Sequence, residues 1–426
     1  MNIAKLHDYF RKSSGACTDT RKIIDNCIFF ALKGDNFNGN LFAAEALENG
    51  AKLAVVDEKT EEENANIILF DDVLDTLQQL ATFHRNFLGT KIIALTGSNG
   101  KTTTKELINA VLSQKYSTTA TIGNLNNHIG VPLTLLAMDK RTEIGIVEMG
   151  ANHLEEINML CKIAQPDYGY ITNFGKAHLE GFGSLEGVIK GKTEMYRFLK
   201  MKNAPVFING YDPIQISKSE GMEIIVFGDE HSDCTINLIE STKELRVMYE
   251  DQFIQSNLIG TYNYPNLAAA IAIGKYFGVT AKEIKNGIET YIPQNNRSQI
   301  MKLGTNTIIM DAYNANPTSM LAALENLNQS EGENKICFLG DMFELGESAK
   351  TEHQTIVNYI DKINPGTIYL VGNNFYKTIS ENKKIQKFKT FDSLKEEIQN
   401  ISFEENLILI KGSRGMALER LLDILK

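Results

Sequence analysis

A glycine-rich turn followed by a lysine and a threonine has the most clearly defined chemistry in this sequence. In residues 94–106, "ALTGSNGKTTTKE", an apolar run ends at Gly97 and Gly100, and Lys101 and Thr102 follow directly. Glycines allow a tight turn whose N–H groups point at an anion, and the start of the next helix adds partial positive charge. The lysine would reach the β- and γ-phosphates, and the threonine hydroxyl would ligate Mg²⁺. The turn therefore predicts a phosphate-binding loop.

This loop is shorter than the common form, because only Ser98 and Asn99 separate its two glycines where four residues are usual. The alternative is a glycine turn that merely links a strand to a helix. The glycine, lysine and threonine in direct succession after an apolar strand favour the phosphate-binding interpretation.

Two further residue types, a glutamate and a histidine, could support a metal. Glu148 follows the strand-like run "EIGIVE", where a second magnesium ligand belongs, although a carboxylate at a strand end is more often a solvated charge or a cap. His178 lies in a loop between glycines, and a structural and a metal-binding role are both open. Lys190 and Lys192 lie on a helical pattern, where surface lysines are the default interpretation.

The bulk composition excludes several classes of protein. The chain has 426 residues, 43% hydrophobic and 23% charged, with a formal charge of -10, which argues against a nucleic-acid binder. Its five scattered cysteines form no CxxC pair and suit reduced thiols in the cytoplasm. The N-terminus has no signal-peptide core, and no run is long enough to cross a membrane. We expect a soluble, cytoplasmic protein.

Strand-like and helix-like segments alternate in three successive groups. Examples of the strand-like runs are "CIFFAL" in the first group, "KIIALTG", "EIGIVEMG" and "YGYITNFG" in the second, and "NTIIMDAY", "KICFLGDM", "TIYLVG" and "LILIKGSRG" in the third. Such alternation indicates an α/β protein with parallel sheets covered on both faces. Ligands gather at the carboxyl ends of parallel strands, so the polar residues after these runs are the site candidates. The group boundaries fall near residues 90 and 293.

Motifs along nearly the whole chain resemble the Mur ligases, ATP-dependent enzymes that form amide bonds in peptidoglycan synthesis. The resemblance rests on "TGSNGKTT", which is the family's short phosphate loop, and on "DTRKI…IFFALKGDNFNGNLFAAEALENGA" at the N-terminus. It also rests on "GNLNNHIGVPLTLL", "EMGANH", "NFGKAHLEGFGS", "DAYNANPTSM", "LGDMFELG" and "KGSRGM". The "YNANP" and "LGDMFELG" segments are most similar to the member that adds D-alanyl-D-alanine to a UDP-N-acetylmuramoyl-tripeptide. The resemblance implies that activity, through an acyl phosphate made at the expense of ATP.

The resemblance also implies three domains. Residues 1–90 would form an α/β domain that binds the UDP-muramoyl peptide, 91–293 a phosphate-loop ATPase domain with a parallel sheet, and 294–426 a Rossmann-like domain that closes over ATP and the dipeptide. Closure would exclude water from the acyl phosphate, so we expect an open free form whose domains rotate on binding. We expect a monomer with no nucleic-acid partner and no membrane insertion.

Individual residues take roles by the same resemblance. The catalytic set is Lys101, Glu148, His178, Lys192 and Arg297. The ATP-binding set is Thr96, Gly97, Ser98, Asn99, Gly100, Lys101, Thr102, Thr103, Asn263, Asn266, Arg297, Asp311 and Tyr313. The set for the acceptor and the dipeptide is Thr20, Arg21, Lys33, Gly34, Asn124, Asn126, Asn127, His128, Asn152, Asn314 and Asn316. Two Mg²⁺ sites are implied, with Thr102, Glu148, His178 and a carbamate on Lys192 as ligands.

Two departures from the family pattern stand in the ATP-binding and dipeptide segments. Tyr262 stands where a histidine is common, and Ala312 replaces a frequent serine. The alternatives to a ligase for this dipeptide are another amino-acid ligase of the same family, a phosphate-loop kinase or hydrolase, and a nucleotide-binding module without catalysis. Lys101, Glu148 and Lys192 are all present, which disfavours the last alternative.

Overall fold

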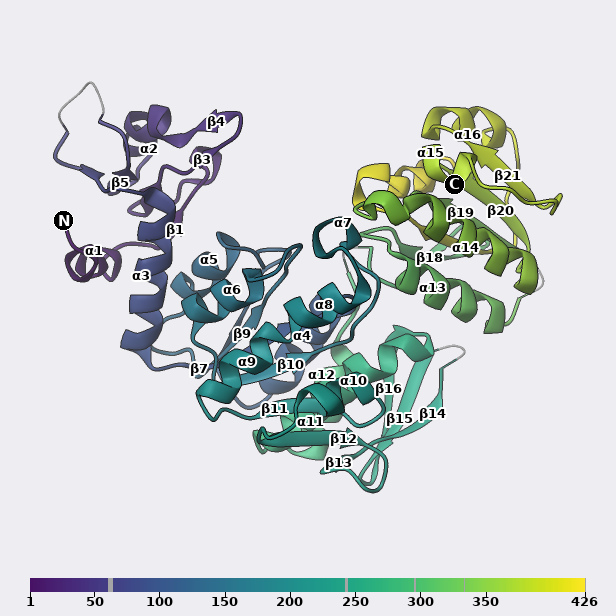
Figure 1. Ribbon diagram of the computed structural model, residues 1–426, viewed down its shortest axis with the longest axis horizontal. Helices are drawn as coiled ribbons and strands as arrows, with labels where there is room; N and C mark the ends of the chain where they lie inside the picture. The colour runs from purple at the N-terminus through teal and green to yellow at the C-terminus, as the bar shows by residue number, and fades with distance from the viewer. Residues whose placement is uncertain (60–63, 242–243, 295, 333, 426) are drawn as a thin grey trace.

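The computed structural model describes residues 1–59, 64–241, 244–294, 296–332 and 334–425. Its parallel sheets are covered by helices, and they form three bodies that follow one another along the chain (Figure 1). The N-terminal body (purple), the central body (teal) and the C-terminal body (green to yellow) confirm the predicted α/β class and three-domain architecture.

The N-terminal domain is built on a four-stranded parallel sheet in the order β1-β2-β5-β6. The strands are β1 (Ala16–Cys17), β2 (Ile28–Phe30), β5 (Leu53–Val56) and β6 (Ile67–Leu69), with the hairpin β3 (Lys33–Gly34) and β4 (Phe37–Asn38) beside them. Its helical segments are α1 (Ile3–Phe10), η1 (Thr20–Lys22), η2 (Gly39–Phe42) and α2 (Ala43–Glu48). Strands β2 and β5 are buried along their whole length, as their uninterrupted apolar runs predict.

A single long helix, α3 (Val73–Leu88), joins the N-terminal domain to the central one. It starts where Asp72 accepts a hydrogen bond from the backbone N–H of Asp75 and ends at Gly89 in the left-handed region. It packs against α1 on one side and against α5 and α6 of the central domain on the other. Figure 1 shows it standing between the two domains.

The central domain contains a seven-stranded sheet in the order β13-β12-β11-β10-β7-β9-β8, and every pairing in it is parallel. The strands are β7 (Lys91–Thr96), β8 (Thr118–Ala120), β9 (Ile144–Glu148), β10 (Tyr168–Ile171), β11 (Val206–Asn209), β12 (Ile224–Gly228) and β13 (Cys234–Thr235). Its helices are α4 (Lys101–Leu112), α5 (Gly130–Leu136), α6 (Glu156–Ala164), α7 (Leu179–Phe182), α8 (Leu185–Lys192), α9 (Glu194–Met201) and α10 (Pro213–Lys218). The first strand, β7, lies inside the sheet between β10 and β9, so the loop that follows it opens at the middle of the sheet edge.

A smaller antiparallel sheet, which the sequence patterns did not reveal, completes this domain. It consists of β14 (Asn237–Glu240), β15 (Glu244–Tyr249) and β16 (Gln252–Ile259). Strand β15 alternates buried and half-buried side chains, which is typical of a sheet with one covered face. The short helix η3 (Thr261–Asn263) and the helices α11 (Tyr264–Tyr276) and α12 (Ala281–Thr290) follow, and α11 and α12 both pack on α4.

The C-terminal domain has a six-stranded sheet in the order β17-β18-β22-β19-β20-β21. The strands are β17 (Gln299–Leu303), β18 (Asn306–Asp311), β19 (Lys335–Gly340), β20 (Thr367–Val371), β21 (Ile385–Phe388) and β22 (Leu407–Lys411), and only the β17–β18 pair is antiparallel. The helical segments are α13 (Pro317–Gln329), η4 (Gly346–Ser348), α14 (Ala349–Ile363), α15 (Asn373–Tyr376), α16 (Phe391–Ile398), η5 (Arg414–Met416) and η6 (Leu418–Asp423).

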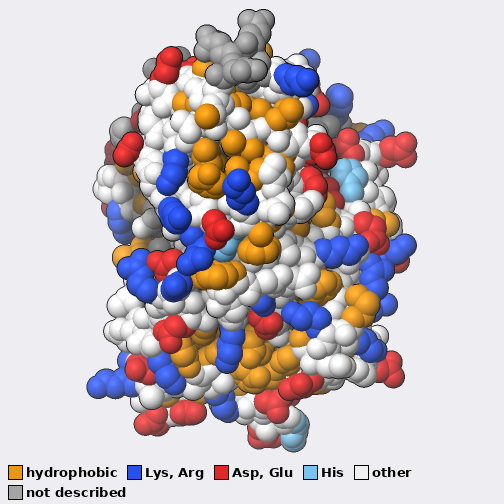
Figure 2. All heavy atoms as spheres, turned by 90° about the vertical axis from the view of Figure 1, so that its left-hand side faces the viewer, with side chains coloured by type: hydrophobic (Ala, Val, Ile, Leu, Met, Phe, Trp, Pro, Cys, Tyr) orange, Lys and Arg blue, Asp and Glu red, His pale blue; other side chains and the backbone are white. Residues whose placement is uncertain are grey.

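The face drawn in Figure 2 carries small hydrophobic clusters among interspersed positive and negative side chains. Within the described residues, no helix combines the length and the apolar character that crossing a membrane requires.

Candidate functional site

A cavity of about 530 Å³ lies where loops of the central domain meet the C-terminal domain. It lies beyond the carboxyl ends of β7 and β9, as expected for a parallel sheet. The predicted residues that line it are Ser98, Asn99, Gly100, Lys101, Thr102, Thr103, Asn124, Asn126, Asn127, His128, Glu148, Asn152, His178, Asn263, Asn266, Arg297, Asp311, Tyr313, Asn314 and Asn316. The predicted ATP-binding and dipeptide residues of two domains therefore share one cavity.

The turn between β7 and α4 can be formed only with glycine at two positions. Gly97 has φ 145° and Gly100 has φ 77°, which side chains rarely adopt. A methyl group at Gly97 would lie 1.9 Å from Thr172 Oγ1, and one at Gly100 would lie 2.4 Å from Asn266 Oδ1. Helix α4 begins at the next residue, Lys101, so its free N–H groups face the cavity side of the turn.

The Lys101 side chain folds back over the turn. Its Nζ donates hydrogen bonds to the carbonyl oxygens of Gly97, at 2.7 Å, and Ser98, at 3.3 Å. Burial lowers the pKa of the Lys101 ammonium, while the charge of Glu148 acts in the opposite direction. A phosphate group at the turn would add negative charge beside this lysine and favour its charged form.

Thr102 and Glu148 offer oxygen atoms that suit Mg²⁺. Within the described part of the chain, the buried Thr102 Oγ1 and Glu148 Oε2 have no hydrogen-bond partner. The other carboxylate oxygen, Glu148 Oε1, accepts a hydrogen bond from Asn126 Nδ2 at 2.7 Å. Buried polar atoms are nearly always paired, so these two orphaned oxygens fit a hard cation that completes its shell with water and phosphate oxygens. Among the described residues, no three His, Cys, Asp or Glu side chains gather into a metal site by themselves.

Lys192 is not on the surface, although its helical sequence pattern favoured a surface position. It is fully buried at the end of α8, whereas its neighbour Lys190 is exposed. Its Nζ donates to the Ala151 carbonyl at 3.1 Å and lies 5.2 Å from the centre of the Phe182 ring. Burial lowers the pKa of Lys192 well below its ordinary value, with Lys101 as a second cause. Lys192 is outside the cavity lining, but Ala151 is part of it.

His178 is placed at the start of α7 in the left-handed region, with φ 53°. Its Nδ1 lies 2.7 Å from Oε2 of Glu344, which belongs to the C-terminal domain. The hydrogen bond from the His178 side chain is the main cause that lowers the pKa of the Glu344 carboxyl. The predicted metal-binding histidine is therefore held at the domain boundary.

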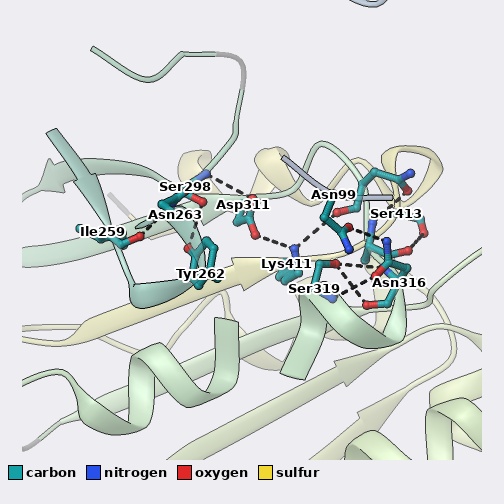
Figure 3. Close-up of polar contacts among 12 residues, drawn as sticks. Asn99, Ile259, Tyr262, Asn263, Ser298, Asp311, Asn316, Ser319, Lys411 and Ser413 are labelled. Atoms are coloured by element: carbon teal, nitrogen blue, oxygen red, sulfur yellow. Dashed lines mark hydrogen bonds and ion pairs between the residues drawn. The ribbon is translucent and has the colours of Figure 1, made fainter. Parts of the chain in front are cut away.

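The C-terminal wall of the cavity contains two charge arrangements, and Figure 3 shows the first of them, the pair of Lys411 and Asp311. Lys411 Nζ lies 2.5 Å from Asp311 Oδ2, and the backbone N–H of Ser298 donates to Asp311 Oδ1 at 3.2 Å. The guanidinium of Arg297 lies 3.7 Å from the centre of the Tyr313 ring, which fixes its plane at the cavity.

Asparagines connect the phosphate loop to the C-terminal domain and to α11. Asn316 caps α13 with its side-chain oxygen, and its Nδ2 donates to Asn99 Oδ1 at 2.7 Å (Figure 3). Asn266 Oδ1 accepts from Thr104 Oγ1 at 3.0 Å, and Asn266 Nδ2 donates to Asn263 Oδ1 at 2.9 Å. These amides hold the start of α4 in place.

Six predicted residues in addition to Lys192 lie outside the cavity lining. Thr96 and Gly97 are at the buried end of β7. Thr20, Arg21, Lys33 and Gly34 lie in the N-terminal domain, on η1 and β3.

The cavity also includes residues that sequence reasoning did not assign to it, among them Glu156, Asn173, Tyr262, Ser298 and Lys411. Lys411 is in the quoted "KGSRGM" motif directly after a strand, so its position at a carboxyl strand end was an available signal. Tyr262 was noticed only as a departure from a pattern. Asn173 begins the quoted "NFGKAHLEGFGS" motif directly after a strand, so the same signal was available for it, whereas Glu156 and Ser298 carry no distinctive sequence signal.

Fold and cavity together define a three-domain α/β protein with a phosphate loop facing a domain boundary. Family models match it as "Mur ligase middle domain" over residues 95–274 and as "Mur ligase, glutamate ligase domain" over residues 296–414. The chain belongs to the Mur ligase family.

Similarity to relatives of this family extends along the whole chain. A UDP-N-acetylmuramoyl-tripeptide--D-alanyl-D-alanine ligase of Bacillus subtilis is 36% identical, covering 96% of this chain and 92% of the relative. The crystal structure I of MurF from Acinetobacter baumannii has 30% identity and a TM-score of 0.87, with 98% of each chain covered. The structure of MurF from Thermotoga maritima in complex with ADP has 27% identity and a TM-score of 0.85 over 98% of each chain.

Proposed function

We propose that this chain joins D-alanyl-D-alanine to a UDP-N-acetylmuramoyl-tripeptide, the two substrates that the names of its relatives give, and that it cleaves ATP to ADP and phosphate in doing so. One observation of the structure carries the proposal. The cavity brings the phosphate loop, the asparagine-rich strip around Asn126 and the C-terminal residues around Asp311 to one place. A ligase needs its nucleotide, acceptor and amine donor to meet in this way.

The reaction has two steps. An acceptor carboxylate oxygen attacks the γ-phosphorus of ATP, the bond to ADP breaks, and an acyl phosphate forms. The free amine of the dipeptide then attacks the acyl carbon, phosphate leaves, and the amine gives up a proton. A terminal amine titrates at about 8, so about a tenth of the dipeptide is already in the reactive neutral form at pH 7.

Residues of this chain would supply positive charge and orientation in the first step. Lys101 and Arg297 would stabilise the negative charge that spreads over the transferring phosphoryl group. Lys101 would leave its carbonyl partners Gly97 and Ser98 for phosphate oxygens. When bound, Mg²⁺ at Thr102 and Glu148 supplies further charge and neutralises the phosphates.

Lys192 would carry the carbamate that the family resemblance implies. An amine adds to CO₂ only in its neutral form, and burial favours that form at Lys192. The product is a carboxylate in place of a cation, which with His178 would suit a second Mg²⁺.

The remaining assignments are parts of the same proposal. Asn263, Asn266, Asp311 and Tyr313 would hold the nucleotide outside its phosphates. Asn124, Asn126, Asn127, His128 and Asn152 would hold the muramoyl peptide, Thr20, Arg21, Lys33 and Gly34 its uridine diphosphate, and Asn314 and Asn316 the dipeptide. Domain boundaries at 90 and 293, a monomer and a cytoplasmic location complete it.

The decisive experiment measures phosphate release from ATP by the purified chain with UDP-muramoyl tripeptide, with and without D-alanyl-D-alanine. Release should require the dipeptide and yield the pentapeptide. Lys101→Ala should lower the rate by about 10²–10³-fold, as loss of one preorganised charge donor does, while circular dichroism stays unchanged. Release at full rate without the dipeptide would instead identify a kinase or hydrolase.

A further inference from the structure

The loop between β10 and α7, residues 173–178, is fixed to the phosphate loop on one side. We call it the bridge loop. The backbone N–H of Asn99 donates to Asn173 Oδ1 at 3.0 Å, and Asn173 Nδ2 donates back to the Asn99 carbonyl at 3.0 Å. Ser98 Oγ donates to the Gly175 carbonyl at 2.8 Å. Neither residue of the short turn can therefore shift without moving the bridge loop.

The C-terminal domain fixes the bridge loop from the other side. The backbone N–H of Lys176 donates to Thr318 Oγ1 at 3.0 Å. Lys176 Nζ donates to Glu352 Oε1 at 2.6 Å. Two residues further on, His178 contacts Glu344, and the N–H of Glu180 donates to the Glu344 carbonyl at 3.1 Å.

Gly175 allows the bridge loop to pass closely between the phosphate loop and the C-terminal domain. A methyl group there would lie 2.9 Å from Asn99 Nδ2 and 3.0 Å from Thr318 Oγ1. The phosphate loop and the C-terminal domain are thus separated at this point by little more than one backbone segment. Closely packed groups pass on small displacements because they have no free space to absorb them.

We propose that Glu352 is a positioning residue: through it, the position of the C-terminal domain against the central domain determines the geometry of the phosphate loop. This inference rests on the proposed function. The Glu352 side chain is only 9% exposed, whereas that of Lys176 is 46% exposed. A buried carboxylate requires a charge partner, so Glu352 pairs with Lys176 whenever the C-terminal domain packs against the central domain. Withdrawal of the C-terminal domain breaks this pair and frees the bridge loop together with Asn99.

The test compares Glu352→Gln, which keeps the shape but removes the charge, with Asp139→Asn, which removes the charge of the exposed pair between Asp139 and Arg141 at 2.6 Å. Amide hydrogen exchange is measured on the full chain without substrates. We expect about tenfold faster exchange in residues 94–106 for Glu352→Gln, as the loss of one charged hydrogen bond predicts. In the Glu352→Gln variant, exchange in β19 should equal that of the unchanged chain. In the Asp139→Asn variant, exchange in residues 94–106 should also equal that of the unchanged chain.

A charge swap makes the test independent of folding defects. Glu352→Lys alone should lose protection in residues 94–106 and about tenfold in ADP affinity. Adding Lys176→Glu should restore both values. Equal exchange in Glu352→Gln and the unchanged chain, or a swap that restores nothing, would overturn the proposal. Absence of pentapeptide synthesis by the unchanged chain would instead refute the proposed function, because the exchange experiment uses no substrate.

Discussion

Lys192 and Lys411 are both fully buried, yet their surroundings differ. Lys411 lies 2.5 Å from the Asp311 carboxylate, which stabilises its charge. Lys192 Nζ donates to the Ala151 carbonyl and lies over the Phe182 ring. An ammonium without a carboxylate partner is costly in such a place, and burial lowers the pKa of Lys192 well below its ordinary value, which favours the neutral amine. The two lysines therefore suit different chemistry.

Removal of dissolved CO₂ should lower the ligase rate, because a neutral Lys192 without its carbamate offers no carboxylate to a cation. We expect a fall of about 10–100-fold, as loss of a metal-supporting group produces, and recovery on addition of bicarbonate. Carbon-13 NMR with labelled bicarbonate should show a carbamate that Lys192→Met lacks, while Lys190→Met, at the exposed neighbour, retains it. A constant rate in CO₂-free buffer together with an absent carbamate signal would refute the modification.

At the scale of elements, the start of α4 depends on the glycine that precedes it, and the packing of α1 on α3 depends on two histidines. Gly100 ends the phosphate loop with φ 77°, and Gly89 ends α3 with φ 68°. Around Gly89 a methyl group would meet nothing within 4 Å, whereas at Gly100 it would meet Asn266. An alanine at Gly89 would therefore suffer backbone strain alone, whereas an alanine at Gly100 would suffer the same strain together with a steric clash.

Both Gly89→Ala and Gly100→Ala should lower the free energy of unfolding by about 1–2 kcal/mol through the left-handed backbone alone. Gly100→Ala should also weaken ADP binding by about tenfold or more, because Asn266 must move and α4 shifts with it. Urea denaturation and titration calorimetry measure the two effects. Equal ADP affinity in both variants would show that the contact with Asn266 is unimportant.

Helices α1 and α3 are joined by a buried pair of histidines. His84 Nε2 contacts the Met138 carbonyl at 2.9 Å and must donate to it, so His84 Nδ1 accepts from His7 Nε2, also at 2.9 Å. The His84 ring is therefore neutral, with its proton on Nε2. Burial, His84 and Arg11 lower the pKa of His7 to about 4, and Asp8 opposes them.

Stability should fall as the pH decreases from about 6.5 toward 4. An unfolded His7 takes up a proton near its ordinary pKa of about 6.5, whereas the folded one resists until about 4. The stabilisation is complete above 6.5 and is lost through this window. Urea midpoints at pH 7.5, 6 and 5 measure the slope, which His7→Gln should flatten and the exposed His231→Gln should not. An unchanged slope in His7→Gln would contradict the assignment.

At the scale of the whole molecule, the sequence predicted the three successive parallel sheets but not the smaller antiparallel sheet. The apolar runs at 91–96, 144–148 and 168–171 became buried parallel strands, and the polar residues after them line the cavity. The antiparallel sheet β14–β16 was not predicted, because its strands are half-exposed and partly polar. Contacts such as Lys176–Glu352 join residues 176 positions apart, and local patterns carry no information about them. The boundaries at 90 and 293 stay predictions.

Domain rotation gives a prediction at this scale. Solution X-ray scattering should show a smaller radius of gyration when an ATP analogue and the UDP-muramoyl tripeptide are both present than with either alone. In the proposed sites the tripeptide links the central domain to the N-terminal one, and the nucleotide links it to the C-terminal one. Lys101→Ala, which weakens nucleotide binding, should reduce the compaction. An identical radius with both ligands would argue against closure.

The strand order of the central sheet also constrains when the chain can first bind nucleotide during its own synthesis. Strand β7 pairs with β9 and β10, whose residues extend to Ile171. A nascent chain that has emerged only as far as residue 140 has the complete glycine turn, but neither neighbouring strand to hold it in shape. The phosphate loop therefore takes its shape only after residues up to 171 have emerged, well after its own residues have left the ribosome.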